Sequence, residues 1–182
     1  GATPFYSWGI MNDHELDELI ARSIAVGASP GPPATDTMIA DAEHRLGVRF
    51  DDQYRRFLRR CNGIDKIGSF DLYPVDELGV SQRWTSVNTF LAGEYLTYDP
   101  TFEMRGDEQI APEFNPPPPG YVPVLIGNDS NFPTMVVGNF SIADPAASPG
   151  EVALCRYEPE LLGTFDDALR VLVAEAEGLA DG

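Results

Sequence analysis

The chain has 182 residues, of which 43% are hydrophobic. This is enough for one domain with a sizeable core, whereas the chain is too short for two comfortable domains. Twelve basic residues against 29 acidic residues leave a formal charge of −17, which argues against direct binding to nucleic acid or to an anionic membrane. No run approaches the ~20 apolar residues of a membrane span, and residues 1–10 lack the pattern of a secretory signal, so we expect a cytoplasmic protein.

A first amphipathic helix is predicted over about residues 13–26. Asn12 stands three residues before Glu15, as in a capping box, and Gly27 ends the helix. The glycines and prolines of residues 29–33 then predict a connector. Residues 1–33 therefore form a helix and connector ahead of the main domain, residues 34–182. The expected buried stripe of the helix is Leu16, Leu19, Ile20 and Ile24.

Two further helices follow. Thr35 is placed as the N-cap of the second helix, which Gly47 ends in the left-handed conformation. Asp51 is placed to cap the third helix, and Asn62-Gly63 closes it. Apolar positions recur every three to four residues in both, which predicts one buried face each. The expected faces are Met38, Ile39, Ala42 and Leu46 in the second helix, and Tyr54, Phe57, Leu58 and Cys61 in the third.

The polar face of the third helix carries four arginines, Arg55, Arg56, Arg59 and Arg60. Like charges four residues apart repel within an isolated helix by roughly 0.2–0.5 kcal/mol. One interpretation is a basic patch for an anionic ligand. Because the chain has such an excess of carboxylates, we expect instead that its own acidic residues pair with these arginines.

One antiparallel sheet is predicted in the rest of the chain, since short runs rich in β-branched or aromatic residues alternate with turn residues. A turn of helix is expected over Val75–Leu78, after Pro74. Helices followed by strands and one closing helix predict an α+β fold, a central antiparallel sheet flanked by helices. The expected strands cover residues 70–73, 121–126, 134–137 and 152–157.

The closing helix is capped by Thr164, with Asp166 and Asp167 favourably placed in its first turn. Its expected buried stripe is Phe165, Ala168, Leu169, Leu172, Ala176 and Leu179. Residues 79–120 show a weaker pattern and end in a proline run, so we interpret them as an insertion. A connection of this length in a compact domain is often functional.

The reactive side chains are not arranged for chemistry. Cys61 and Cys155 stand far apart in apolar surroundings, which favours reduced core residues, and His14 and His44 fall on polar helix faces. Neither a nucleophile elbow nor a calcium loop nor a phosphate-binding loop is present, and adjacent carboxylates alone do not indicate a site. We therefore predict no enzyme, no metal and no cofactor.

A group of residues in the second and third helices follows the order helix, Leu-Gly turn, helix, Asn-Gly turn: Ile39, Glu43, Leu46, Gly47, Val48, Phe50, Tyr54, Phe57, Leu58, Asn62 and Gly63. This order resembles the opening signature of the SMI1/KNR4 (SUKH) family. The strand at 70–73 and the P-x-x-E-L step at 74–78 are also similar, and the resemblance covers about residues 34–172. The chain departs from the family at Asp51-Asp52, where a proline is usual, and in the Gly-Asp-rich turn, which is here 128–132.

The resemblance implies a sheet flanked by helices without catalytic residues, found mainly in bacterial immunity proteins against toxins, many of them nucleases, and in a fungal regulator of cell-wall synthesis. It favours a protein that neutralises a toxin by covering the toxin's cationic cleft. The alternative is a regulatory or scaffolding module with a non-toxic partner. Glu43 is open to an active-site interpretation, but we favour a carboxylate that accepts backbone N–H groups of a nearby loop.

The expected partner is thus a basic toxin domain, because an acidic surface speeds encounter with a basic one and buried aromatics supply affinity. The negative charge also has a simpler explanation, namely solubility. The aromatic residues of the insertion could likewise fill a local core. The predicted contacts, in the insertion and the 128–132 turn, are Tyr95, Tyr98, Asp99, Phe102, Glu103, Asp107, Glu108, Asp129, Asn131 and Phe132.

Overall fold

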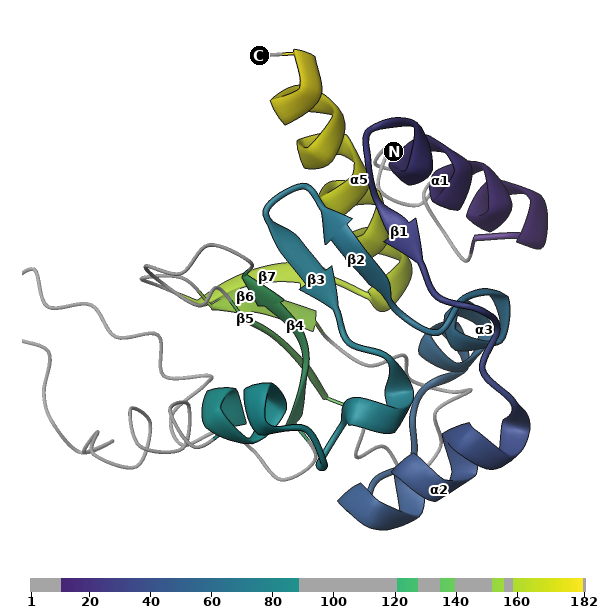
Figure 1. Ribbon diagram of the computed structural model, residues 1–182, viewed down its shortest axis with the longest axis vertical. Coiled ribbons are helices and arrows are strands. Elements are labelled where there is room, and N and C mark those ends of the chain that lie inside the picture. Colours follow the sequence, from purple (N-terminus) through teal and green to yellow (C-terminus); the bar gives the residue numbers. More distant parts are fainter. Residues whose placement is uncertain (1–10, 89–120, 128–134, 140–151, 156–158, 182) are drawn as a thin grey trace, which may run out of the picture.

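The computed structural model describes residues 11–88, 121–127, 135–139, 152–155 and 159–181. It contains helices at both ends of the chain and a single antiparallel sheet between them, which confirms the α+β prediction (Figure 1). The elements in chain order are α1 (Asp13–Ala25), β1 (Ser29–Pro30), α2 (Asp36–Leu46), α3 (Asp52–Arg60), β2 (Ile64–Ile67), β3 (Phe70–Leu72), η2 (Val75–Glu77), β4 (Tyr121–Gly127), β5 (Met135–Asn139), β6 (Val152–Cys155), β7 (Pro159–Gly163) and α5 (Phe165–Asp181). Residues 82–88 are also helical.

The sheet has the strand order β1-β2-β3-β4-β5-β6-β7, and each neighbouring pair is antiparallel. Three of these strands, β1, β2 and β7, were not predicted from the sequence. β1 is only two residues long and lies in the predicted connector, where it pairs with β2. The side chains of β2 do not alternate between buried and exposed positions, since both end residues are buried and the two between them are exposed. One of these two, Lys66, adopts a left-handed φ of 59°. β7 begins with a proline and ends with a glycine, two residues that strands disfavour.

The predicted helix caps are confirmed. The side chain of Asn12 accepts a hydrogen bond from the Glu15 N–H at 2.8 Å, and Thr35 and Asp51 cap α2 and α3 in the same way. Gly47 ends α2 at a φ of 67°. α3 ends at Arg60, and Cys61 is already extended. Asn62-Gly63 therefore closes the turn that follows the helix.

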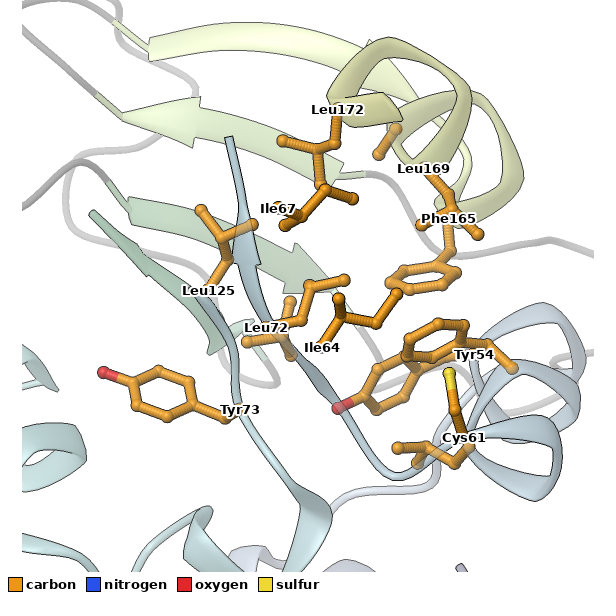
Figure 2. Close-up of a cluster of buried hydrophobic side chains, with 14 of the residues drawn as sticks. Tyr54, Cys61, Ile64, Ile67, Leu72, Tyr73, Leu125, Phe165, Leu169 and Leu172 are labelled. Carbon is orange, nitrogen blue, oxygen red and sulfur yellow. The ribbon is translucent and has the colours of Figure 1, made fainter. Parts of the chain in front are cut away.

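The core lies between the sheet and the helices α3 and α5 (Figure 2). Its centre is aromatic, because the rings of Tyr54 and Phe57 on α3 each lie 5.0 Å from the ring of Phe165 on α5. Such contacts contribute about 0.5–1.5 kcal/mol beyond burial alone. Met11 and Leu16, from the N-terminal part of the chain, are buried in the same core.

Two residues of the predicted buried stripes are exposed. Ile24 is 53% exposed and Leu179 is 61% exposed. Both lie in the last turns of their helices, α1 and α5, and Figure 1 shows the end of α5 running past the sheet. The helical periodicity continues to the helix ends, but the surface against which the helices pack does not.

The Asn62-Gly63 turn joins α3 to the sheet and to η2. The Asn62 side chain accepts a hydrogen bond from the Val75 N–H at 2.6 Å and donates one to Asp76 at 2.9 Å. Gly63 has a φ of 83°, and a Cβ there would lie 2.6 Å from the carbonyl oxygen of Leu72. This position therefore requires glycine both for its conformation and for its space.

Arg83 connects the helical residues 82–88 to the region around η2. Its Nε and Nη2 donate to the Glu77 carboxylate, each at 2.7 Å, and its guanidinium lies 5.0 Å from the centre of the Tyr73 ring. The hydrogen bonds from Arg83 are the main cause of a lowered pKa of the Glu77 carboxyl. The start of the predicted 79–120 insertion is thus held against η2, whereas residues 89–120 lie outside the described residues.

We predict that Gly63→Ala lowers the free energy of unfolding by about 3 kcal/mol, from backbone strain and a clash with backbone atoms. Gly178→Ala is the matched control, because Gly178 lies in α5 and a Cβ at this position would meet nothing within 4 Å. It should raise the stability by about 0.5–1 kcal/mol through helix propensity. Urea unfolding measures both changes, and similar effects of the two variants would contradict this account of Gly63.

A second prediction concerns the Glu77–Arg83 pair. The folded pKa of Glu77 is lowered below its ordinary value of 4.5, so its ionisation stabilises the fold above that pH and the contribution disappears as the pH falls through the folded pKa. Because the pair is partly exposed, Glu77→Gln should cost at most about 1 kcal/mol at pH 7. The cost should shrink at pH 3.5. Equal costs at both values in urea unfolding would show that the contribution is not ionic.

Candidate protein-binding site

The predicted partner contacts lie outside the residues that the structure describes. They are Tyr95, Tyr98, Asp99, Phe102, Glu103, Asp107 and Glu108 of the insertion, and Asp129, Asn131 and Phe132 of the turn. They therefore stay predictions. The part of the chain that the structure describes offers a different surface, formed by α1, α5 and the end of β7.

The residues of the family signature make contacts within the fold. Glu43 accepts a hydrogen bond from the Phe50 N–H at 2.8 Å and forms an ion pair with Arg55 at 2.8 Å. The bond from Phe50 confirms the interpretation of Glu43 as an acceptor for a nearby loop. Arg45 ties α2 to η2, because it donates to the carbonyl oxygens of Leu78 and Val75. The apolar signature residues Ile39, Tyr54, Phe57 and Leu58 are buried, and Leu46 is partly buried.

The four arginines of α3 pair with carboxylates of the same chain, as expected. Arg55 binds Glu43, Arg56 binds Asp166 at 2.9 Å, and Arg59 binds Asp36 at 2.8 Å. Arg60 lies 3.3 Å from Asp13 and 3.5 Å from Asp17 on α1. Each arginine of α3 thus has a carboxylate partner within the chain.

The side chains relevant to metal binding and reactivity include Cys61, His14 and His44. No group of three or more His, Cys, Asp and Glu side chains among them could hold a metal ion. Burial raises the pKa of the Cys61 thiol to about 12, which keeps it protonated and unreactive. His14 and His44 are exposed. In the same part of the chain, each helix is too short or too polar to cross a membrane.

α1 lies alongside α5 in a parallel arrangement with a constant register. The Met11 N–H donates to Asp166 at 2.9 Å, Arg170 donates to Glu15 at 3.1 Å, and Arg22 donates to Glu177 at 3.1 Å. The two residues of each pair are 155 positions apart in the sequence. The contacts therefore advance together along both helices, as in a parallel two-helix pair.

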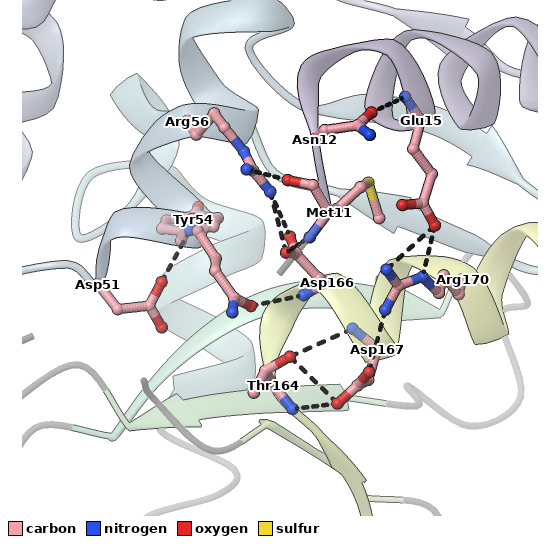
Figure 3. Close-up of polar contacts among 11 residues, drawn as sticks. Met11, Asn12, Glu15, Asp51, Tyr54, Arg56, Thr164, Asp166, Asp167 and Arg170 are labelled. Atoms are coloured by element: carbon pink, nitrogen blue, oxygen red, sulfur yellow. Dashed lines mark hydrogen bonds and ion pairs between the residues drawn. The ribbon is translucent and has the colours of Figure 1, made fainter. Parts of the chain in front are cut away.

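Asp166 anchors the start of this pair (Figure 3). Its side chain is 2% exposed and accepts hydrogen bonds from the Met11 N–H and from Arg56, at 2.9 Å each for Oδ2. Arg56 also donates to the Met11 carbonyl oxygen, and the Asp166 N–H donates to Gln53 at 3.0 Å. Burial raises the pKa of Asp166, whereas Met11 and Arg56 act in the opposite direction.

A groove of about 1010 Å³ lies between α1 and α5 beside the end of β7. Each helix contributes positions spaced i, i+3 or i+4, and i+7, so two turns of each form the walls. Glu18 and Ala174 are exposed, whereas Val171 and Leu162 are partly buried. The lining residues are Glu15, Glu18, Leu19, Arg22, Leu162, Gly163, Asp167, Arg170, Val171 and Ala174, and we call this surface the α1–α5 groove.

The charged residues of the α1–α5 groove leave it acidic. Arg170 is bound by Glu15 and Asp167, at 3.1 and 3.2 Å. Arg22 is bound by Glu177, and this carboxylate is the main cause of its raised pKa. Both cations of the groove are thus engaged within the chain. Glu18, one turn before Arg22, adds a further exposed carboxylate.

Sequence reasoning missed this groove. The groove face of α5 is distinct from its apolar stripe, so the prediction of buried residues did not include it. This face consists of Asp167, Arg170, Val171 and Ala174. A signal was present nevertheless. Glu15 and Arg22 on one helix, and Arg170 and Glu177 on the other, have opposite charges at the same spacing of seven, which matches in a parallel pair. Periodicity alone does not reveal which two helices meet.

The sequence and the fold agree with a known family. The model of the SMI1 / KNR4 family (SUKH-1) matches residues 33–167, well over half of the chain. A search of curated proteins gives no significant match. The family match includes α2, α3 and the strands β2 to β7, while α1 and most of α5, which form the walls of the groove, lie outside it. The chain belongs to the SMI1/KNR4 family (SUKH-1).

Proposed function

We propose that this protein is an immunity protein that binds a cognate basic toxin in the cytoplasm, with nucleases among the candidate targets, and neutralises it by stoichiometric occlusion. The observation that carries the proposal is the family match over residues 33–167. Immunity proteins are the main kind of protein that this resemblance implies. A basic toxin domain is the partner that suits a chain of charge −17.

The internal ion pairs support an acidic binding surface. The arginines of α3, together with Arg22, Arg83 and Arg170, are held by carboxylates of the same chain. Such pairs use the positive charge for folding and leave the surplus carboxylates to face a partner. Long-range attraction between opposite charges then raises the association rate, and salt weakens it.

A non-catalytic mode of action is supported by the roles of the polar signature residues. Glu43 and Asn62 each accept a hydrogen bond from loop backbone, from the N–H groups of Phe50 and Val75. Occlusion requires only a complementary surface and no reacting group. An inhibitor of this kind acts once per toxin molecule, so the ratio of the two proteins at complete inhibition distinguishes it from an enzyme.

We predict that the product of the reading frame adjacent to the native gene is lethal when expressed alone and harmless when co-expressed with this protein. With both proteins purified, toxin activity should fall linearly as this protein is added and reach zero at a ratio of about one to one. Loss of activity at a ratio far below one would indicate catalysis and contradict occlusion. A neighbour that is harmless alone would favour the regulatory or scaffolding module over the immunity protein.

A further inference from the structure

We propose that the α1–α5 groove binds a helical segment of the partner that carries an apolar stripe flanked by Lys or Arg. The inference deepens the proposed function, on which it rests for the nature of the partner. It assigns the contact to a surface that lies mainly outside the family match, so it predicts that α1 and α5 provide recognition that is particular to this chain.

The shape of the groove fits a helix. The lining positions of α1 are 15, 18, 19 and 22, and those of α5 are 167, 170, 171 and 174. Each set covers two turns, and the constant offset of 155 between bonded residues keeps the turns of α1 and α5 side by side. A third helix placed along such a pair packs its own i, i+3 and i+4 ridges into the groove between them.

The lining of the groove includes four apolar side chains. Leu19 is buried, Val171 and Leu162 are partly buried, and Ala174 is exposed. Because alanine is the smallest of these side chains, it leaves room in the wall for a large apolar residue of the partner. A few such buried anchors commonly carry most of the binding energy of an interface.

The rim selects for positive charge. Glu15 and Asp167 share the single Arg170, so this cluster keeps one negative charge, and Glu18 adds another. Arg22 is offset by Glu177. A segment with basic residues beside its apolar stripe would meet these carboxylates, whereas an acidic segment would be repelled. The same repulsion argues against a second copy of this chain as the occupant, because its charge is also −17.

The test uses a probe, a fluorescein-labelled 14-residue peptide of Leu and Lys in which Leu recurs at i, i+3, i+4 and i+7. A control peptide has the same composition with the Leu residues scrambled, so its charge is equal but its stripe is lost. Fluorescence anisotropy with the full chain should show a Kd at least tenfold lower for the striped peptide. Amide NMR shifts should concentrate in residues 15–22 and 162–174. Equal affinities for both peptides would reduce the effect to charge alone and overturn the proposal.

Variants with matched controls test the location. Ala174→Trp fills the groove and Glu18→Lys reverses a rim charge, and each should weaken binding of the striped peptide at least tenfold. Ala40→Trp and Asp41→Lys make the same changes at exposed positions of α2, outside the groove, and should leave the Kd within twofold. Equal losses in variants and controls would overturn the assignment. Circular dichroism and urea unfolding confirm that all four variants fold.

Two further outcomes would assign the groove to another occupant and overturn the proposal. In sedimentation velocity, a dimer of the free chain that Ala174→Trp dissociates would identify a second copy. An absence of peptide binding, together with shifts of the residue 1–10 resonances in the Ala174→Trp variant, would identify the chain's own N-terminal segment. None of these peptide measurements requires a toxin, so the inference can fail while the co-expression test succeeds, and the reverse.

Discussion

The carboxylate of Asp166 joins three segments that lie far apart in the sequence. It is almost completely buried, and it binds the backbone of Met11 just before α1 and the guanidinium of Arg56 on α3. A buried charge that loses its partner costs about 3–5 kcal/mol, so these contacts strongly favour one placement of α1. The pairs Glu15–Arg170 and Arg22–Glu177 continue the register that Met11 and Asp166 begin. The α1–α5 groove exists because this register holds.

The distribution of charge links stability to recognition. The cations of α3 and of the groove are held by carboxylates of the same chain, so the folded protein presents its acidic surplus to the solvent. Exposed pairs contribute little stability individually, about 0–1 kcal/mol, but they decide which charges remain for a partner. The family match identifies the family of residues 33–167, whereas the walls of the groove come mainly from residues outside this range. A common scaffold can in this way carry a contact surface of its own.

Local signals in the sequence predicted the helices well, because caps such as Asn12, Thr35 and Asp51 act through hydrogen bonds within three residues. The excess of carboxylates in the sequence predicted the pairing of the α3 arginines, and Glu43 was correctly predicted to accept backbone N–H groups of a nearby loop. The strands β1, β2 and β7 were not predicted, since their formation depends on partner strands more than on their own residues. The exposure of Ile24 and Leu179, and the meeting of α1 with α5, depend on tertiary packing that helical periodicity does not contain.

Native-state hydrogen exchange tests most directly whether α1 is an integral part of the fold and so a wall of the groove. If Asp166 and the pairs along α5 hold it in place, the amides of Leu19 and Ile20 in α1 should exchange only through global unfolding. Their opening free energies should then equal those of Leu169 and Leu172 in α5. Exchange of the α1 amides that is orders of magnitude faster than exchange of the α5 amides would show that α1 opens independently, and it would contradict the account.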